Sequence, residues 1–318
     1  MSRTVKPLDF LGIGAGKSGT TTLFHYLKHH PQLYLPPEKE IPFFSDDSWF
    51  CQGWQTYAEE YFLHAPADKL WGKISPQYMS AAWIPERIAH TMPAVKLIVL
   101  LRSPIDRALS YYRMMVRHGK ESRTFEEAVR EQLQPANLAN ARHLSTTDDE
   151  LTQTYLVRGE YGRILGDFRQ WFPREQICVA FTDDLEQEPQ AVLNRIYSFL
   201  GVKPEFTPPN LGKRYHVGGT RQRFPQLISR TQKVAPIRWL WRTIPSRQRR
   251  VLFSWYKMQF NIIPDSPATL CSAVREQLIE FYRPDLQLLE RLLNQKVPWA
   301  EFAKAEVVVD TPVSILST

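Results

Sequence analysis

A glycine-rich turn near the start of the chain carries residue types that bind phosphate-like anions. The turn, Gly14-Ala-Gly-Lys-Ser-Gly19, follows the apolar run Phe10–Ile13 and precedes Thr20–His30, whose apolar residues recur at helical spacing. Glycines let the backbone approach a ligand closely, and a helix N-terminus presents N–H groups and partial positive charge. Lys17 adds a full charge, and the three threonines that open the helix add hydroxyl donors. The sequence therefore predicts a strand, an anion-binding turn and a helix.

This turn departs from two common nucleotide-binding motifs. Gly16-Lys-Ser18 matches the end of the triphosphate loop GxxxxGK[ST], but Leu11 occupies the position of that loop's first glycine. The dinucleotide fingerprint needs an acidic residue about 20 residues further on, at the end of a second strand, and none stands there. A P-loop-like kinase stays an alternative, which turnover of a nucleoside triphosphate with Mg²⁺ would establish.

A second anion-binding pattern lies at Arg102-Ser-Pro-Ile-Asp-Arg-Ala-Leu-Ser110. Lys96–Leu101 is the most strand-like run of the chain, and Pro104 favours the first turn of a helix. Arg102 is therefore expected at the carboxyl end of a strand, where open α/β sheets bind ligands. A guanidinium there and the Ser110 hydroxyl on the following helix can converge on one phosphate. The alternative for Ser110 is a helix serine that faces solvent or a carbonyl.

A third pattern places carboxylates beside cationic and aromatic residues, in Pro36-Pro-Glu-Lys-Glu-Ile-Pro-Phe-Phe44. A positioned carboxylate near cations can take a proton from a hydroxyl, which makes the hydroxyl a nucleophile. The alternative is a charged surface turn that Phe43 and Phe44 anchor in the core.

These patterns, in this order, resemble the family of sulfotransferases that use 3′-phosphoadenosine 5′-phosphosulfate (PAPS). The resemblance covers residues 8–225. It implies that the glycine-rich turn binds the 5′-phosphosulfate and that Arg102 and Ser110 bind the 3′-phosphate. The residues implied for the 5′-phosphosulfate are Gly16, Lys17, Ser18, Gly19, Thr20, Thr21 and Thr22.

The resemblance also selects the catalytic base. Glycan-type sulfotransferases carry a similar Lys-Glu-x-x-Phe-Phe stretch with the Glu as base, and Glu40 matches it whereas Glu38 does not. In the cytosolic branch a histidine acts as base near a later motif, where this chain has Ile74 and Ser75. That departure favours Glu40, and His118 is the remaining histidine candidate.

Two further segments are similar to family motifs. Trp71-Gly-Lys-Ile-Ser-Pro-Gln-Tyr78 resembles a Lys-x-x-Pro-x-Tyr stretch, which implies that Lys73 places a second ammonium in the cleft. The stretch Gly218–Arg223 resembles, more loosely, the loop that closes over the 3′-phosphate. It adds Gly219, Thr220 and Arg221 to the expected cofactor-binding residues.

The expected reaction is sulfuryl transfer by positioning and electrostatics. Glu40 deprotonates an acceptor hydroxyl, which attacks the sulfur in line, and Lys17 stabilises the charge that builds on the departing phosphate. Lys73 and the hydroxyls of Thr20–Thr22 hold the sulfuryl and 5′-phosphate oxygens. No metal is expected, because lysines neutralise the charge and no carboxylate cluster offers a Mg²⁺ site. The acceptor is expected to be a carbohydrate or another alkyl alcohol.

The elements that position these residues predict a single α/β domain over residues 1–318. Alternating strands and helices favour a three-layer sandwich with a central parallel sheet and a P-loop-like turn, plus a C-terminal helical elaboration. Residues 226–318 match no feature of the family. The other expected elements are a capped helix at Thr124–Gln134, a polar loop at 135–150, a helix at Thr154–Phe172, a strand at Gln176–Phe181, a helix at Pro189–Leu200 and helical patterns around 267–294.

The net charge of +7 arises in one segment. Residues 206–264 carry twelve Lys or Arg and no Asp or Glu, whereas the rest has 28 basic and 33 acidic residues. One interpretation is structural, with arginine stems packed on tryptophans. Another is a cleft border that attracts an anionic acceptor or an anionic membrane surface. A nucleic-acid binder is the third, although no nucleic-acid partner is expected; salt-dependent binding to generic DNA or heparin without nucleotide would establish it.

Composition and the absence of certain patterns argue against several classes of protein. At 43% hydrophobic and 23% charged residues, the chain is neither disordered nor fibrous. The longest aliphatic run, Leu97–Leu101, is too short to span a membrane, and the N-terminus lacks a secretory signal. Cys51, Cys178 and Cys271 form neither a disulfide framework nor a zinc pattern. A cytoplasmic enzyme is therefore expected.

Overall fold

The computed structural model describes residues 5–40, 42–144, 151–215, 220–222, 262–264 and 270–303, with the backbone alone for 220–222 and 262–264. Most of the basic segment and the predicted site residue Gly219 therefore lie outside the described residues, and the side chains of Thr220 and Arg221 do too. The backbone of Thr220–Gln222 (β6) pairs antiparallel with Ile262–Pro264 (β7).

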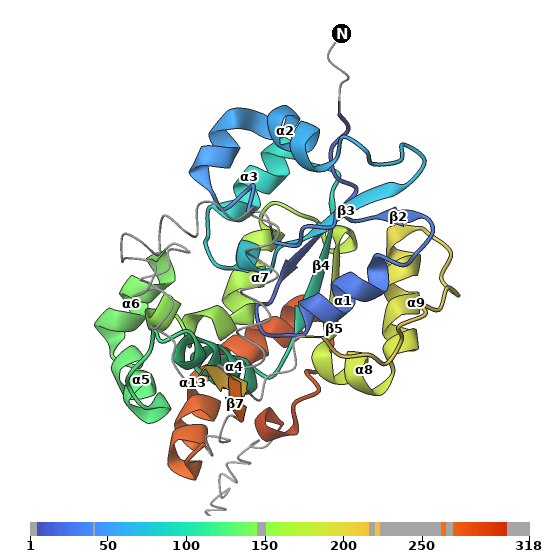
Figure 1. Ribbon diagram of the computed structural model, residues 1–318. Coiled ribbons are helices and arrows are strands. Elements are labelled where there is room, and N and C mark those ends of the chain that lie inside the picture. The colour runs from blue at the N-terminus through green and yellow to red at the C-terminus, as the bar shows by residue number, and fades with distance from the viewer. Residues whose placement is uncertain are drawn as a thin grey trace, which may run out of the picture.

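A five-stranded parallel sheet forms the centre of the protein (Figure 1). Its spatial order is β2-β3-β1-β4-β5. The strands are β1 (Phe10–Gly14), β2 (Leu33–Tyr34), β3 (Leu70–Ile74), β4 (Lys96–Leu101) and β5 (Ile177–Phe181). The central strands β1 and β4 are apolar almost throughout, as strands covered on both faces must be.

Helices cover both faces of the sheet, which confirms the three-layer α/β fold. The helices are α1 (Thr20–Leu27), α2 (Asp47–Tyr61), α3 (Ile84–Thr91), α4 (Pro104–Arg117), α5 (Phe125–Gln132), α6 (Pro135–His143), α7 (Tyr161–Arg169), α8 (Thr182–Gln187), α9 (Pro189–Leu200) and α13 (Ser272–Leu293). Short 3₁₀ turns are η1 (Pro76–Met79), η2 (Leu151–Gln153), η3 (Val157–Gly159), η4 (Arg174–Gln176) and η5 (Ala300–Phe302).

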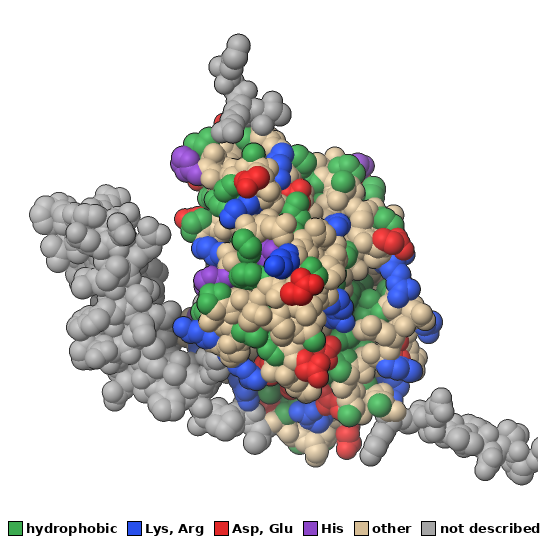
Figure 2. Space-filling model, turned by 90° about the vertical axis from the view of Figure 1, so that its right-hand side faces the viewer, with side chains coloured by type: hydrophobic (Ala, Val, Ile, Leu, Met, Phe, Trp, Pro, Cys, Tyr) green, Lys and Arg blue, Asp and Glu red, His purple; other side chains and the backbone are tan. Residues whose placement is uncertain are grey.

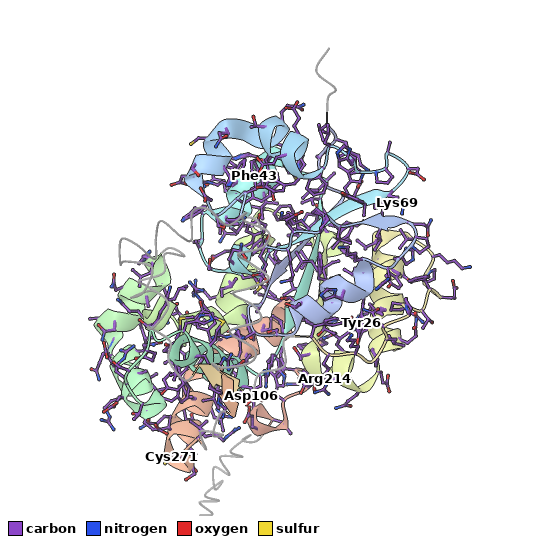
Figure 3. The ribbon with its side chains drawn as sticks, viewed as in Figure 1. Tyr26, Phe43, Lys69, Asp106, Arg214 and Cys271 are labelled. Atoms are coloured by element: carbon purple, nitrogen blue, oxygen red, sulfur yellow. The ribbon has the colours of Figure 1, made fainter. Side chains whose placement is uncertain are left out.

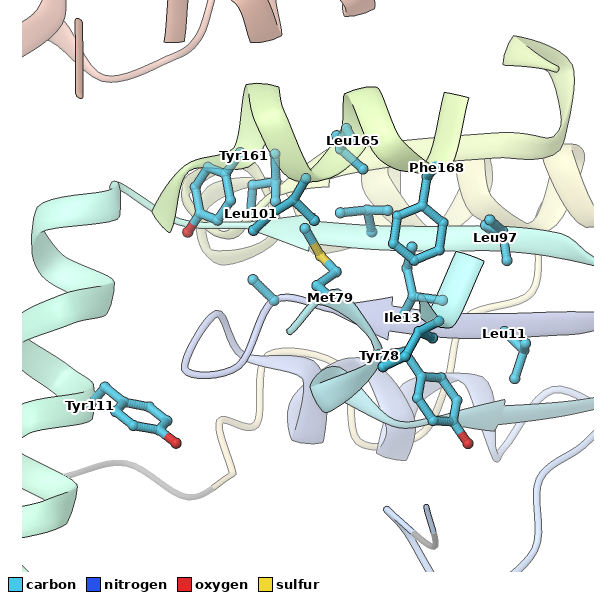
Figure 4. Close-up of a cluster of buried hydrophobic side chains, with 14 of the residues drawn as sticks. Leu11, Ile13, Tyr78, Met79, Leu97, Leu101, Tyr111, Tyr161, Leu165 and Phe168 are labelled. Carbon is cyan, nitrogen blue, oxygen red and sulfur yellow. The ribbon is translucent and has the colours of Figure 1, made fainter. Parts of the chain in front are cut away.

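Alternation along β4 separates two cores. Ile98 and Leu100 pack with residues of α1, α8 and α9. Leu97, Val99 and Leu101 pack on the opposite face with residues of α2, α3, α4, α7 and α13. Figure 4 shows this second core, where α7 faces β4.

Most expected elements are confirmed, and two expectations are wrong. The capping box at Thr124 is present, since its side chain accepts from the Glu127 N–H and the Glu127 carboxylate accepts from the Thr124 N–H. The expected loop at 135–150 contains α6, which starts at a proline. The expected long helix at Thr154–Phe172 is shorter: α7 covers only Tyr161–Arg169, and before it lie the 3₁₀ turn η3 and Glu160, whose ψ of 69° is not helical. The carboxylate of Asp285, on the distant α13, accepts from the N–H groups of Gly162 and Arg163 in the first turn of α7 and so fixes its start.

The C-terminal elaboration is helical, as expected, and α13 packs along α7 and α4. Among the described residues, no helix combines the length and apolar character that a membrane crossing requires.

Close packing between β1 and β3 gives a stability test. A Cβ at Gly72 would overlap the ring of the fully buried Phe10, its register partner. Gly72→Ala is therefore expected to lower the free energy of unfolding by about 1–3 kcal/mol in urea titrations. Gly166→Ala is the matched control, because a Cβ on that α7 glycine meets nothing within 4 Å. It is expected to raise the same free energy by up to about 1 kcal/mol. Equal effects of the two changes would contradict this packing.

Candidate functional site

A cavity of about 980 Å³ lies at the carboxyl ends of β1, β4 and β5. Parallel strands bring these ends to one edge of the sheet, so residues distant in sequence meet there. The lining comes mainly from the glycine-rich turn, α1, the Glu40 loop, η1, α4, η3, α8 and the residues Gly212, Arg214 and Tyr215. Figure 3 labels three lining residues from different elements: Tyr26 on α1, Asp106 on α4 and Arg214 after α9.

The glycine-rich turn is fixed to the strand ends behind it. The Ala15 N–H donates to the Leu100 carbonyl at 2.7 Å. The Thr182 hydroxyl lies 2.8 Å from the Ser18 carbonyl and 3.0 Å from that of Leu101. Gly19, at the start of α1, has a φ of 85°, which only glycine adopts readily. The N-terminus of α1 is thereby held at the cavity, and the N–H groups at the start of a helix are the ones available to a ligand.

Lys17 extends into this cavity from a backbone φ of 74°. Its Nζ lies 3.7 Å from the sulfur of Met114 on α4. Burial lowers the pKa of Lys17 to about 8, and the positive charges of Arg117 and Arg102 act in the same direction. The carboxylate of Glu40 opposes that change. A cation held among other cations in this way is suited to bind an anion.

The expected phosphosulfate residues divide into two groups. Six of the seven line the cavity: Gly16, Lys17, Gly19, Thr20, Thr21 and Thr22. Ser18 is fully buried and does not line it. The Thr22 hydroxyl accepts from the Tyr215 N–H at 3.1 Å, which joins α1 to the segment after α9.

Arg102 and Ser110 meet at the same cavity. Arg102 directly follows β4, and Ser110 lies two turns into α4. The Asp106 carboxylate, in the first turn of the helix, lies 3.8 Å from the Arg102 guanidinium. The buried Tyr161 donates its hydroxyl to the Arg102 carbonyl at 2.9 Å. Tyr161 therefore supports the loop from behind and does not line the cavity.

Glu40 lies at the rim of the cavity beside Lys39, with which it forms an ion pair. The Glu40 side chain is 46% exposed, and its φ is 66°. Burial lowers the pKa of Lys39, and the Glu40 carboxylate opposes that change. The loop is anchored in the core by Phe43, whose N–H donates to the Tyr78 hydroxyl at 3.1 Å.

Lys73 does not lie in the cleft, where the family resemblance placed it. It does not line the cavity, and its side chain is buried against α2. Its Nζ lies 5.0 Å from the ring centre of Tyr57 and 5.3 Å from that of Tyr61. Burial lowers the pKa of Lys73 to about 7, against the opposing charge of Glu38. The cause is register: Lys73 pairs with Leu11, which faces the core beneath α2, so the sheet directs Lys73 to that face.

Sequence reasoning missed most of the basic lining. On the face shown in Figure 2, Lys and Arg side chains are mixed with Asp and Glu side chains. The cavity instead has eight basic and three acidic lining residues, which favours an anionic ligand. The missed basic residues are Lys39, Arg107, Arg113, Arg117 and Arg158. Arg214 also lines the cavity and belongs to the basic segment, for which a cleft border was one interpretation. Helical spacing from Ser110 could have identified Arg113 and Arg117.

One other sequence candidate, His118, has less support from the geometry as a catalytic base. His118 is exposed at the end of α4 and does not line the cavity. Within the described ranges, no three His, Cys, Asp or Glu side chains are grouped to hold a metal ion. The absence of a metal from the reaction stays a prediction.

The protein-family model that describes the sulfotransferase domain matches residues 7–211, more than half of the chain. The chain belongs to the sulfotransferase family. It is 34% identical over 132 residues to the membrane-associated sulfotransferase kil1 of Dictyostelium discoideum, covering 39% of this chain and 28% of that protein. It is 29% identical over 202 residues to heparan sulfate glucosamine 3-O-sulfotransferase 5 of Mus musculus, covering 63% of this chain and 55% of that protein.

A solved structure supports the fold of this sulfotransferase. The sulfotransferase from Alicyclobacillus acidocaldarius is 21% identical, with a TM-score of 0.64 over 94% of this chain and all of that one. The sequence relatives are longer, and the matches to kil1 and to the 3-O-sulfotransferase span about a quarter and about half of their lengths. The family match ends at residue 211, so α13 and η5 lie beyond it.

The environment of Lys17 gives a pH test. Acylation of the Lys17 amine, followed by mass spectrometry, is expected to reach half its maximal rate near pH 8, because only the neutral amine reacts. Arg117→Gln should move the half-point to higher pH, since removing a positive charge favours the protonated amine. Arg174→Gln, outside the cavity lining, is the matched control. A half-point near 10.5, the ordinary value, or no response to Arg117→Gln would contradict this electrostatic environment.

Proposed function

We propose that this sulfotransferase moves a sulfuryl group from PAPS to an acceptor hydroxyl. The observation that carries the proposal is one cavity lined by Lys17 of the glycine-rich turn, by Arg102 with Ser110, and by Glu40. Membership of the sulfotransferase family supports the same reaction class. The experiment that tests it is an assay of PAPS-dependent sulfuryl transfer over a panel of acceptors.

The anion-binding groups of the cavity match the charged groups of PAPS. A nucleotide with phosphate on both sides of its ribose needs two separate anion sites, and the cavity has two. The first is the turn with Lys17 and the start of α1, where a Cβ at Gly16 would meet nothing within 4 Å. The second is the pair Arg102 and Ser110. When bound, PAPS would supply the activated sulfuryl group and a phosphate leaving group.

The chain's own residues would supply positioning and proton transfer. A carboxylate oxygen of Glu40 would take the proton from the hydroxyl of the acceptor molecule. The hydroxyl oxygen would thereby become a stronger nucleophile. The Lys17 ammonium would stabilise negative charge on the 5′-phosphate side, and the Thr20–Thr22 hydroxyls would orient its oxygens. The protonated form of Lys17 does this work, so an anionic ligand that raises its pKa also strengthens its own binding.

A carbohydrate or another alkyl alcohol is the acceptor class that we propose. The relatives named as heparan sulfate enzymes act, by their names, on a glycan, and they support this class. The basic lining favours an acceptor that carries negative charge. The kinase alternative has no support from the comparisons. A cytoplasmic location stays a prediction from the sequence.

The Arg102 site predicts nucleotide selectivity. Arg102→Ala is expected to weaken the binding of adenosine 3′,5′-bisphosphate on the order of 10- to 100-fold, because a charge-assisted bond to the 3′-phosphate is lost. Binding of adenosine 5′-monophosphate should change much less. Calorimetric titration with both nucleotides measures the difference. Equal losses for the two would show that Arg102 does not bind the 3′-phosphate.

If Glu40 is the general base, its substitution should lower kcat without weakening nucleotide binding. Glu40→Gln should lower kcat by at least about 10²-fold, as loss of a general base does, with little change in affinity for adenosine 3′,5′-bisphosphate. Glu38→Gln is the matched control, since Glu38 is on the same loop but not in the cavity lining. It is expected to keep normal turnover. If Glu40→Gln turns over like the unaltered enzyme, another residue is the base.

A further inference from the structure

The end of the described chain contacts the Arg102 loop from the side opposite the cavity. The hydroxyl of Ser103, the residue after Arg102, donates to the Glu301 carboxylate at 2.8 Å. The other oxygen of Glu301 forms an ion pair with Arg275 of α13. Ser103 is 6% exposed and immediately precedes Pro104, the first residue of α4. The contact therefore lies where the phosphate-binding loop becomes the helix that carries Ser110.

Trp299 extends the same contact to a second loop of the site. It is 5% exposed, and its indole N–H donates to the Asp183 carboxylate at 3.1 Å. Asp183 follows Thr182, whose hydroxyl holds the glycine-rich turn. The Trp299 ring also packs edge-on against Phe181, with ring centres 5.5 Å apart.

The C-terminal helix fixes the Arg102 carbonyl indirectly. Asp285 of α13 accepts the N–H groups of Gly162 and Arg163 at 2.8 Å each, which positions the start of α7. Tyr161, the first residue of α7, donates to the Arg102 carbonyl and packs against Trp299. Figure 1 shows this C-terminal segment, orange to red, beside α4 and α7. Arg102 and Ser103 are thus held by one support made of residues 270–303.

We propose that Glu301 and Trp299 are positioning residues for recognition of the nucleotide's 3′-phosphate. They do not line the cavity; they hold the backbone from which the Arg102 guanidinium reaches it. Small displacements of a binding group cost much of its effect, so the support matters for affinity. The inference rests on the proposed function and assigns a role in the nucleotide site to a segment beyond the family match.

The hydrogen bond between Ser103 and Glu301 is the part that can be tested directly. Glu301→Ala and Ser103→Ala each remove one partner. Each is expected to weaken the binding of adenosine 3′,5′-bisphosphate about three- to tenfold, because a displaced Arg102 guanidinium loses part of its charge-assisted bond to the 3′-phosphate. Binding of adenosine 5′-monophosphate should change less than about twofold. In the double variant the losses should not add, because both changes break the same contact.

The ratio of the affinity for adenosine 3′,5′-bisphosphate to that for adenosine 5′-monophosphate distinguishes a positioning role from a purely structural one. Glu280→Gln removes a carboxylate from an exposed ion pair with Arg283 on α13 and should leave the ratio unchanged. Glu301→Gln keeps an acceptor for Ser103 and should restore most of the ratio lost in Glu301→Ala. Calorimetry gives both affinities, and thermal unfolding shows how much stability each variant loses.

The outcomes separate this inference from the proposed function. If the unaltered chain does not prefer the bisphosphate, the proposed function fails and the inference fails with it. If the unaltered chain has that preference, but Glu301→Ala lowers both affinities equally or neither, the positioning role alone is overturned. Additive losses in the double variant, or no rescue by Glu301→Gln, would likewise overturn it.

Discussion

The parallel register of β1, β4 and β5 is the constraint on which the site depends. It brings three strand ends to one edge, where the Ala15 N–H meets the Leu100 carbonyl and Thr182 joins the glycine-rich turn to β4. These contacts tie the glycine-rich turn to β4 and to the residue that follows β5, so the anion-binding groups are fixed before a ligand arrives. Such preorganisation reduces the ordering that binding would otherwise require.

The same arrangement creates an electrostatic cost that an anion relieves. Lys17 is buried near Arg102 and Arg117. Burial is the larger cause of its lowered pKa, and repulsion from the two guanidinium groups adds to it. The core on the far side of the sheet and the C-terminal segment hold these cations in place against that repulsion. A bound phosphate would offset the repulsion, so the free energy stored in the cation cluster favours the charged ligand over a neutral one.

Lys73 shows how strongly the sheet controls side-chain placement. Adjacent residues of a strand face opposite sides, so the register that places Ile74 in the core with α1 directs Lys73 toward α2. There its ammonium lies over two tyrosine rings. A motif match by itself specifies the residue type, whereas the pleat of β3 specifies the surroundings.

Local patterns in the sequence were sufficient for the parts whose physics is local. Apolar runs predicted the strands at Phe10–Ile13 and Lys96–Leu101, and capping chemistry predicted the capping box at Thr124. The same local patterns also predicted the fold class and the turn that carries Lys17. The tertiary structure decided the break before α7, because Asp285 caps that helix from more than a hundred residues away. It also decided the support of Ser103 by Glu301, because a contact between such distant residues leaves no periodic signal in the sequence.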